Sequence, residues 1–518
     1  MKKIIIPVLV FAMLFSACAK MQENETTDSA LSDDESFAVD VTEIKLSNAE
    51  ITVDGNSIST EKTEAVYSAE DIIYYESGND FTYGEGSEKD AHSKEDADSH
   101  TVVHITKAGT YSVCGKISKG QLAIDLGEGA KDNKDAVVTL ILNGIDIPCE
   151  VAPAIIFYNV YECGNADSEN ADKDVDTTNA GANVIIADDT VNIVNGSYVE
   201  RIYKPGTVIL SEDGTEVEDA EKLHKYDGAF YSKMSMNING GKNGTGTLNI
   251  IADNEGLDSE LHLTINGGNI NINSGNDGIN TNEDGVSVAT INGGKLCIKV
   301  TGETGEGDGI DSNGWLVING GRVEAAACSF SEDAGIDSDM GIHINGGYVI
   351  ATGSMLDRIE DGSRNYVVIN FSEKQDKSKG KISLKDKDGK ITEEYYPEND
   401  FSVLIFSSPA LTEGTYSLWQ GNVQLEAVSG EMAGGFNPGM PPEGMPPEGM
   451  SPDKMPSEEI SSGFPEDNSR PGMPAGEMMP PEDFSRPERP GEYAPDTETG
   501  EFSKEIKIKN GANMLTVK

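Results

Sequence analysis

The chain has 518 residues, enough for several ordinary domains or one long repeat array, and its 90 Asp and Glu against 39 Lys and Arg give a formal net charge of −51. Such a charge repels nucleic acid, which is therefore excluded as a partner, whereas metal cations, neutral sugars and cation-bridged anionic polymers are compatible with it. Glycine is frequent (57 residues) and aromatic residues make up only 6%, which favours closely spaced turns over a large aromatic core.

Residues 1–18 predict a lipoprotein signal peptide. Two lysines precede an apolar stretch that is too short to span a bilayer, and the stretch ends in Phe-Ser-Ala-Cys. This ending resembles the bacterial lipoprotein cleavage box, although Phe15 stands where Leu is usual. We expect acylation of Cys18, which would anchor the chain to the extracellular face of the cell membrane; ordinary secretion is the alternative. The acidic residues 19–39 are expected to form a solvated tether.

The next segments alternate apolar and polar residues, which is the period of β-strands. They are expected to form early, less regular coils of the architecture described below. The acidic inserts near residues 85–100 and 164–181 are expected to be loops between those coils. The alternating segments are residues 104–125, 136–147 and 182–196.

An Asn-Gly-Gly triplet recurs five times, each time after an isoleucine, at steps of 27, 26, 27 and 26 residues. Such regularity marks a repeat array. Apolar residues alternate on both sides of each triplet, so short strands flank a corner, and Asn and Gly accept the left-handed backbone that a sharp corner needs. Stacked strands of this kind predict an all-β parallel β-helix with coils of roughly 26–27 residues. The triplets begin at Asn239, Asn266, Asn292, Asn319 and Asn345.

A second, acidic corner precedes each of the last four triplets. If these corners stack, one column contains Asp258, Asn280, Asp311 and Asp337, and a second contains Glu255, Asp277 and Asp308. Carboxylates about 5 Å apart repel by roughly 1 kcal/mol per pair in water and by more where water is excluded. Two interpretations remain: calcium, a hard cation with six to eight oxygen ligands, binds the seven side chains, or the side chains only cap turns. The corners read EGLDSE (255–260), DGINTN (277–282), DGIDSN (308–313) and AGIDSD (334–339).

A row of side chains is predicted on the outer face, three residues after each Asn. Trp315, one of only two tryptophans, also falls outside the inward phase. An exposed indole near Lys and Arg suits stacking on a sugar ring and pairing with its hydroxyls or carboxylate. The alternative is a tryptophan packed under a neighbouring loop. The predicted carbohydrate-binding residues are therefore Trp315, Lys295, Arg322 and Tyr348.

The pattern weakens after the last triplet. Residues 365–371 and 401–420 still alternate and are expected to form closing or capping strands. Residues 431–498 are rich in Pro, Gly, Met and Glu, cannot bury a core, and predict a disordered segment. Residues 501–518 alternate again and predict a final β-hairpin or strand.

These motifs in combination resemble a family of extracellular carbohydrate-binding proteins. The resemblance covers most of residues 40–425, from ITKAGTYSVCGKISKGQ through GAFYSKMSMNINGG and the four acidic corners to FSSPALTEGTYSL. It implies a calcium-binding, right-handed parallel β-helix, similar in architecture to pectate lyases, that binds cellulose-like and acidic plant-wall polysaccharides. Asn280 and Ala334, where the pattern favours carboxylates, put full metal occupancy in question.

Three functions therefore compete. The first is a non-enzymatic, surface-anchored polysaccharide binder with a calcium-stabilised β-helix, and it is the one we expect. The second is a pectate-type lyase, in which calcium would acidify a proton and Arg322 or Lys295 would remove it. The third is a structural or adhesive stalk. The sequence leaves the oligomeric state open.

Overall fold

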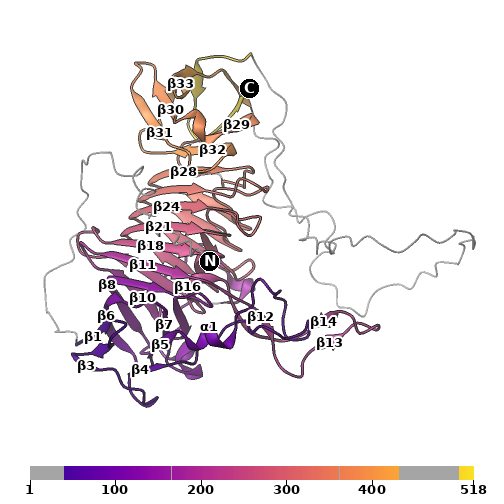
Figure 1. Ribbon diagram of the computed structural model, residues 1–518. Helices are drawn as coiled ribbons and strands as arrows, with labels where there is room; N and C mark the ends of the chain where they lie inside the picture. Colours follow the sequence, from indigo (N-terminus) through magenta and orange to yellow (C-terminus); the bar gives the residue numbers. More distant parts are fainter. Residues whose placement is uncertain (1–39, 165, 361, 431–500) are drawn as a thin grey trace, which may run out of the picture. The chain divides into compact units, whose positions relative to one another are not determined.

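The computed structural model describes residues 40–164, 166–360, 362–430 and 501–518 (Figure 1). The predicted signal peptide with Cys18, the tether at 19–39 and the segment 431–498 lie outside these residues. All the structure below belongs to one unit of the chain, Met1–Glu431 with Thr497–Lys518. Its described part is all-β, with mixed parallel and antiparallel sheets.

Helix is scarce in the described residues. There is one short α-helix, α1 (Lys94–Asp98), and three 3₁₀ turns, Glu128–Asp132, Ser168–Asn170 and Lys377–Lys379. None of these helices has the length and hydropathy needed to cross a membrane. The prediction of a plain loop at 85–100 was wrong at α1, where the Ser93 hydroxyl accepts a hydrogen bond from the Asp96 N–H (3.1 Å) and Ala97 is buried. A capped turn with one apolar residue left too weak a pattern to detect.

Three columns of parallel strands form the main body. The first column, before the Asn-Gly-Gly corner, contains β10 (Ala182–Ile186), β17 (Met236–Gly240), β20 (Leu263–Ile265), β23 (Val288–Ile291), β25 (Trp315–Ile318) and β27 (Gly341–Ile344). The second, after the corner, contains β8 (Val138–Pro148), β11 (Val191–Gly196), β18 (Thr247–Ala252), β21 (Asn269–Ser274), β24 (Lys295–Val300), β26 (Arg322–Ala326) and β28 (Tyr348–Gly353). The third contains β5 (Thr101–Ile105), β7 (Gly120–Asp125), β9 (Ile155–Asn159), β16 (Gly228–Ser232), β19 (Glu255–Ser259) and β22 (Ile279–Thr281).

Equivalent repeat positions pair in register, as the spacing predicted. Leu263 pairs with Ala289, Leu316 with Ala289, and Ile342 with Leu316. The apolar residues of the acidic corners are buried in the core, none more than 1% exposed. Period-2 alternation therefore located both the strands and their inward faces.

Smaller strands precede and flank the columns. β1 (Val41–Leu46) and β6 (Gly109–Lys116) extend the second column in parallel, and β4 (Val66–Ala69) pairs antiparallel with β5. Six other short strands before β16 form antiparallel pairs. They are β2 (Thr52–Val53), β3 (Asn56–Ser57), β12 (Val199–Tyr203), β13 (Ile209–Leu210), β14 (Val217–Asp219) and β15 (Lys222–Tyr226).

The Asn-Gly-Gly corners match the prediction at the glycine and differ from it at the asparagine. In the last four triplets the second glycine, for example Gly268 (φ +93°) or Gly347 (φ +72°), adopts the left-handed conformation, and none of the asparagines does. The asparagines instead form a side-chain ladder along the corner, in which each amide N–H donates to the amide oxygen of the preceding coil. The four bonds joining Asn239, Asn266, Asn292, Asn319 and Asn345 measure 2.9–3.0 Å.

Most strand pairs beyond β28 are antiparallel. β28 pairs antiparallel with β32 (Phe401–Ser407), which also pairs with β29 (Tyr366–Gln375). A five-stranded antiparallel sheet follows, with its own buried core of residues such as Ile382, Leu384 and Leu418. Its strands are β30 (Ile382–Asp386), β31 (Ile391–Tyr395), β33 (Gly414–Gln420), β34 (Val423–Gln424) and β36 (Ile506–Ile508). The last strand, β37 (Ala512–Val517), pairs in parallel with β29 and antiparallel with β35 (Ala427–Gly430).

A buried carboxyl in this second core predicts a pH effect. Burial raises the pKa of Glu393 to about 7, while its bond with the Ser408 hydroxyl and the charge of Arg322 act in the opposite direction. Because the folded-state pKa is raised, stability is highest at low pH and falls as the pH rises from about 4.5 to about 7. At pH 8 we expect Glu393→Gln to raise the free energy of unfolding by about 2 kcal/mol, and at pH 4 to change it little. Urea unfolding at pH 8 and at pH 4 measures the change in the free energy of unfolding. An equal change at the two pH values would contradict the prediction.

Candidate functional site

The acidic corners of the third column stack into two columns of side chains. Asp258 pairs with Asn280, an Ile279–Ile310 bridge brings Asp311 alongside, and the Asp337 N–H donates to the Ile310 carbonyl (2.7 Å). We call Asp258, Asn280, Asp311 and Asp337 the Asp258 column. Bonds from Gly256 N–H to the Asp277 carbonyl (2.9 Å) and from Gly278 N–H to the Asp308 carbonyl (3.0 Å) align Glu255, Asp277 and Asp308, the Glu255 column. All seven predicted metal ligands are thus neighbours along one edge of the coils.

Glycine before the apolar residue makes this stacking possible. A Cβ on Gly309 would lie 2.3 Å from the Gly335 carbonyl oxygen, and one on Gly278 would lie 2.5 Å from the Gly309 carbonyl oxygen. Successive coils approach too closely here for any side chain. The glycine of the Gly-Ile-Asp step is therefore required by packing between coils.

Three aspartates from the two columns form the tightest acidic cluster in the described residues. Asp308, Asp311 and Asp337 each offer a carboxylate oxygen, these oxygens lie within 4.8 Å of one another, and all three residues are buried. Hard oxygen ligands at this spacing suit calcium, which tolerates irregular coordination by carboxylates and carbonyls.

A second group of oxygens lies one to two coils earlier. Glu255 Oε2, Asp258 Oδ2 and Asn280 Oδ1 are buried and accept no hydrogen bond. Their partner atoms are satisfied, since Asn280 Nδ2 donates to Glu255 Oε1 (3.1 Å) and Asn282 Nδ2 donates to Asp258 Oδ1 (2.7 Å). Burial of an oxygen that accepts no hydrogen bond lowers the stability of the fold unless a cation or a proton binds to that oxygen.

Burial makes these carboxyls hard to ionise. It raises the pKa of Glu255, Asp258, Asp277 and Asp308 well above the usual range, and neighbouring carboxylates raise each one further. At neutral pH such groups must hold protons or be neutralised by a positive charge.

Backbone amides of the next coil contact two of the buried carboxylates. Asp308 Oδ1 accepts from the Ala334 N–H (2.6 Å), and Asp277 Oδ1 accepts from the Asp308 N–H (2.7 Å). The partners are 26 and 31 residues apart in the chain, so these bonds join coils and are not the local bonds of the turn-capping interpretation. One buried oxygen each of Glu255, Asp258 and Asn280 accepts no hydrogen bond. The residues present therefore also fit a bound hard cation.

Sequence reasoning missed two carboxylates that lie next to the Asp258 and Glu255 columns. We call the two columns and these two carboxylates the acidic edge. Asp357 Oδ2 accepts from the Ser338 N–H (3.0 Å), and burial followed by the nearby Asp337 raises the pKa of Asp357 to about 7. Asp227 lies at the other end, is 9% exposed and forms an ion pair with Lys225 (2.9 Å). Asp227 is the first residue of DGAFYSK (227–233), a looser version of the acidic corners and a usable signal, whereas no repeat motif surrounds Asp357.

The predicted outer row forms on the second column. Asn269, Lys295, Arg322 and Tyr348 pair in register on successive strands, and we call them the basic row. Arg322 Nε donates to Glu324 Oε1 (2.6 Å), and its guanidinium lies 5.8 Å from the centroid of the Tyr348 ring. Tyr348 is 40% exposed. The row therefore presents positive charge beside an exposed aromatic ring.

Trp315 lies on a different strand column from this row. It begins β25, between Val288 and Gly341 of the adjacent coils, and the Asn319 corner separates it from Arg322 on β26. It is half-buried, so the indole is accessible in part rather than fully exposed. The structure thus gathers Lys295, Arg322 and Tyr348 on one strand column and places Trp315 on another.

The family follows from a sequence comparison. A family model for carbohydrate-binding domain-containing proteins matches residues 99–197 and 169–392, more than half of the chain. The chain belongs to this family. All the predicted metal and carbohydrate residues, from Glu255 to Tyr348, lie within the matched region. No curated protein matches the chain.

A solved structure also matches. It is described as a polysaccharide lyase-like protein from C. thermocellum, shares 18% sequence identity, and aligns with 59% of this chain and 92% of its own, with a TM-score of 0.31.

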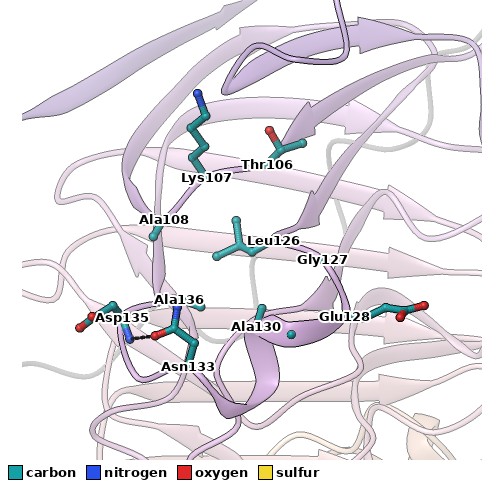
Figure 2. Close-up of a pocket in the computed structure, with 11 residues that line it drawn as sticks. Thr106, Lys107, Ala108, Leu126, Gly127, Glu128, Ala130, Asn133, Asp135 and Ala136 are labelled. Carbon is teal, nitrogen blue, oxygen red and sulfur yellow. Dashed lines mark hydrogen bonds between the residues drawn. The ribbon is translucent and has the colours of Figure 1, made fainter.

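A surface pocket of this carbohydrate-binding domain lies away from the predicted residues. Figure 2 shows it between the turn after β5 and the 3₁₀ turn at Glu128–Asp132, where Asn133 Oδ1 accepts from the Asp135 N–H (3.1 Å). Its lining includes Lys107 and Glu128 but no member of either acidic column or of the basic row. It therefore adds nothing to the candidate site.

Proposed function

We propose that this protein is a cell-surface polysaccharide binder built on a calcium-stabilised, right-handed parallel β-helix. Its membership of a carbohydrate-binding family supports the general function. The observation that carries the finer proposal is the basic row, where Lys295, Arg322 and Tyr348 stack at the spacing of successive coils. A periodic row of cations and an aromatic ring suits a polymer that repeats along its own length, such as polygalacturonate or a cellulose-like glucan.

Calcium would serve the acidic edge rather than catalyse a reaction. Asp308, Asp311 and Asp337 would hold one ion, and Glu255, Asp258, Asp277 and Asn280 supply further oxygens. A bound cation would neutralise the columns and fix the corner geometry beneath the outer faces. Acylation of Cys18 would hold the chain at the extracellular face of the membrane.

We propose binding without catalysis. A lyase needs a basic group that can accept a proton, and arginine stays protonated at all working pH values. The Arg322 guanidinium is also engaged with Glu324. With polygalacturonate and calcium we expect no rise in the ultraviolet absorbance of unsaturated products; a steady rise would make the protein an enzyme and Lys295 the first base to test.

The basic row, together with Trp315 on the other strand column, predicts specific losses of binding. We expect Arg322→Gln and Trp315→Ala to weaken calcium-dependent binding of polygalacturonate at least tenfold, the size typical for central Arg and Trp contacts. Sedimentation with the insoluble polymer, in calcium and in chelator, measures this. Lys116→Gln is the matched control, because Lys116 is an exposed cation on β6, outside the row. Equal losses in the control and the row variants would contradict the proposal.

A further inference from the structure

The outward side of the C-terminal antiparallel sheet carries polar and aromatic side chains that the function above does not use. Ile382, Leu384 and Leu418 point into the second core, so the residues between them point outward. Ser383 pairs with Glu394 and with Trp419, Lys385 pairs with Ser417, and Thr415 pairs with Lys507. The strands concerned, β30, β31 and β33, lie together in Figure 1. We call this surface the lysine–aromatic face; it comprises Lys381, Lys385, Lys507, Glu394, Tyr396 and Trp419.

This surface is positive on a strongly negative chain. The face has three lysines and one carboxylate, Glu394, which Lys381 Nζ contacts at 2.5 Å. Residues 374–390, which include β30, contain seven of the chain's 39 basic residues and only three acidic ones. Most of the rest of the molecule repels polyanions, so an anionic ligand would be drawn selectively to this sheet. The charge contrast points to an anionic ligand and argues against a neutral glucan.

Aromatic rings lie next to the ammonium groups. Lys385 Nζ is 3.9 Å from the centroid of the Trp419 ring, and Lys381 Nζ is 5.8 Å from that of Tyr396. Trp419 Nε1 donates to the Ser417 hydroxyl (3.0 Å), which fixes the indole, and Tyr396 is 54% exposed. Since Lys385 covers part of the indole, a ligand that binds there must offer an anion to its ammonium group as well as a surface that stacks. A uronate residue of a polysaccharide has both.

We propose that the lysine–aromatic face is a second polysaccharide site, which binds uronate-rich chains directly through Lys381 and Lys385 and without calcium. One uronate carboxylate pairs with the Lys385 ammonium group, a second competes with Glu394 for that of Lys381, and the sugar rings lie against Trp419 and Tyr396. Trp419 lies beyond the region matched by the family model, which ends at residue 392. The inference extends the proposed polysaccharide binding to another surface of the same unit.

Binding in chelator tests this site on the full chain without its signal peptide. We expect EDTA-resistant binding of polygalacturonate that weakens with added salt, and no comparable binding of fully methyl-esterified polygalacturonate, which has the same backbone without the charge. A Lys381→Gln/Lys385→Gln variant should bind at least about tenfold more weakly, as should Trp419→Ala. Lys385→Arg should bind nearly as well as the unaltered chain, because charge and ring contact persist.

The control is Lys387→Gln, which removes one charge from the turn after β30, where the Lys387 side chain is 75% exposed. It should keep its affinity within about twofold. Unchanged circular dichroism spectra and thermal midpoints would show that the variants are folded. Equal binding of the esterified polymer, or no loss in the double-lysine variant, would overturn the proposal.

The same assay separates this site from the basic row. If Arg322→Gln abolishes the EDTA-resistant binding while the double-lysine variant does not, the second site fails and the row binds the polymer without calcium. If EDTA-resistant binding depends on Lys381 and Lys385 while calcium adds none, the second site stands and the calcium-dependent row fails.

Discussion

Replacing Gly309 by alanine should lower the free energy of unfolding by about 3 kcal/mol, at the upper end of the range for overpacked positions. A Cβ there would lie 2.3 Å from the Gly335 carbonyl oxygen and 2.9 Å from the Ala325 Cβ, so backbone of the next coil would have to move. The neighbouring Ala334 carbonyl accepts a hydrogen bond from the Gly309 N–H (3.0 Å), so a shift of this segment would strain the bonding between the two coils. Urea unfolding followed by circular dichroism measures the change.

The matched control is Gly129→Ala. Gly129 lies in a 3₁₀ turn, and a Cβ there meets no heavy atom within 4 Å. This substitution should alter stability by less than about 0.5 kcal/mol. If Gly309→Ala were as mild as the control, the close approach between coils would not be the reason for glycine at this position.

Removing calcium should lower the thermal midpoint of the protein, and substitution of the aspartate cluster should abolish most of that loss. With free calcium at 100 times its dissociation constant, a single site contributes about 2.7 kcal/mol of stability. Asp311→Asn removes one of the three converging carboxylates. The variant should be less stable than the unaltered chain in calcium and equally or more stable in EDTA, where fewer buried carboxylates repel one another.

The decisive result is that the stability order of Asp311→Asn and the unaltered chain reverses between calcium and EDTA. Differential scanning calorimetry in both buffers detects it, and Asp337→Ala should behave in the same direction. Asp388→Asn is the control, since it removes the same charge from a side chain that is 74% exposed on a turn. A thermal midpoint that does not respond to calcium would exclude the metal and leave turn capping as the role of the aspartates.

The sequence was informative where the repeat is regular. Five Asn-Gly-Gly triplets predicted the strand columns and their register, because one residue of slip would turn every Ile and Leu out of the core. The same regularity predicted which residues line the acidic edge and the basic row. Asp357 could not be predicted from the sequence because no repeat motif includes it. A bridge between Ile342 and Ile359 brings it next to the acidic edge.

Other features depend on long-range contacts that no local pattern encodes. The antiparallel sheet combines β30, β31 and β33 with β36, which lies about 90 residues further along the chain, so its outward face could not be read from spacing. The corner asparagines were recognised as turn residues, yet their side-chain ladder forms only once five coils are stacked. Trp315 illustrates the same limit, since its partial burial depends on the neighbouring coils.

The antiparallel pairing of β32 with β28 has a consequence for self-association of the protein at high concentration. A stack of parallel strands ends in a row of backbone donors and acceptors that can recruit another copy, which is the route by which such edges grow into fibres. In this chain, five residue pairs from Val349–Ser407 to Gly353–Val403 occupy that edge with a strand running the opposite way. Growth at this end is therefore blocked by the chain itself, and a variant that loses β32 should gain a tendency to polymerise rather than only lose stability.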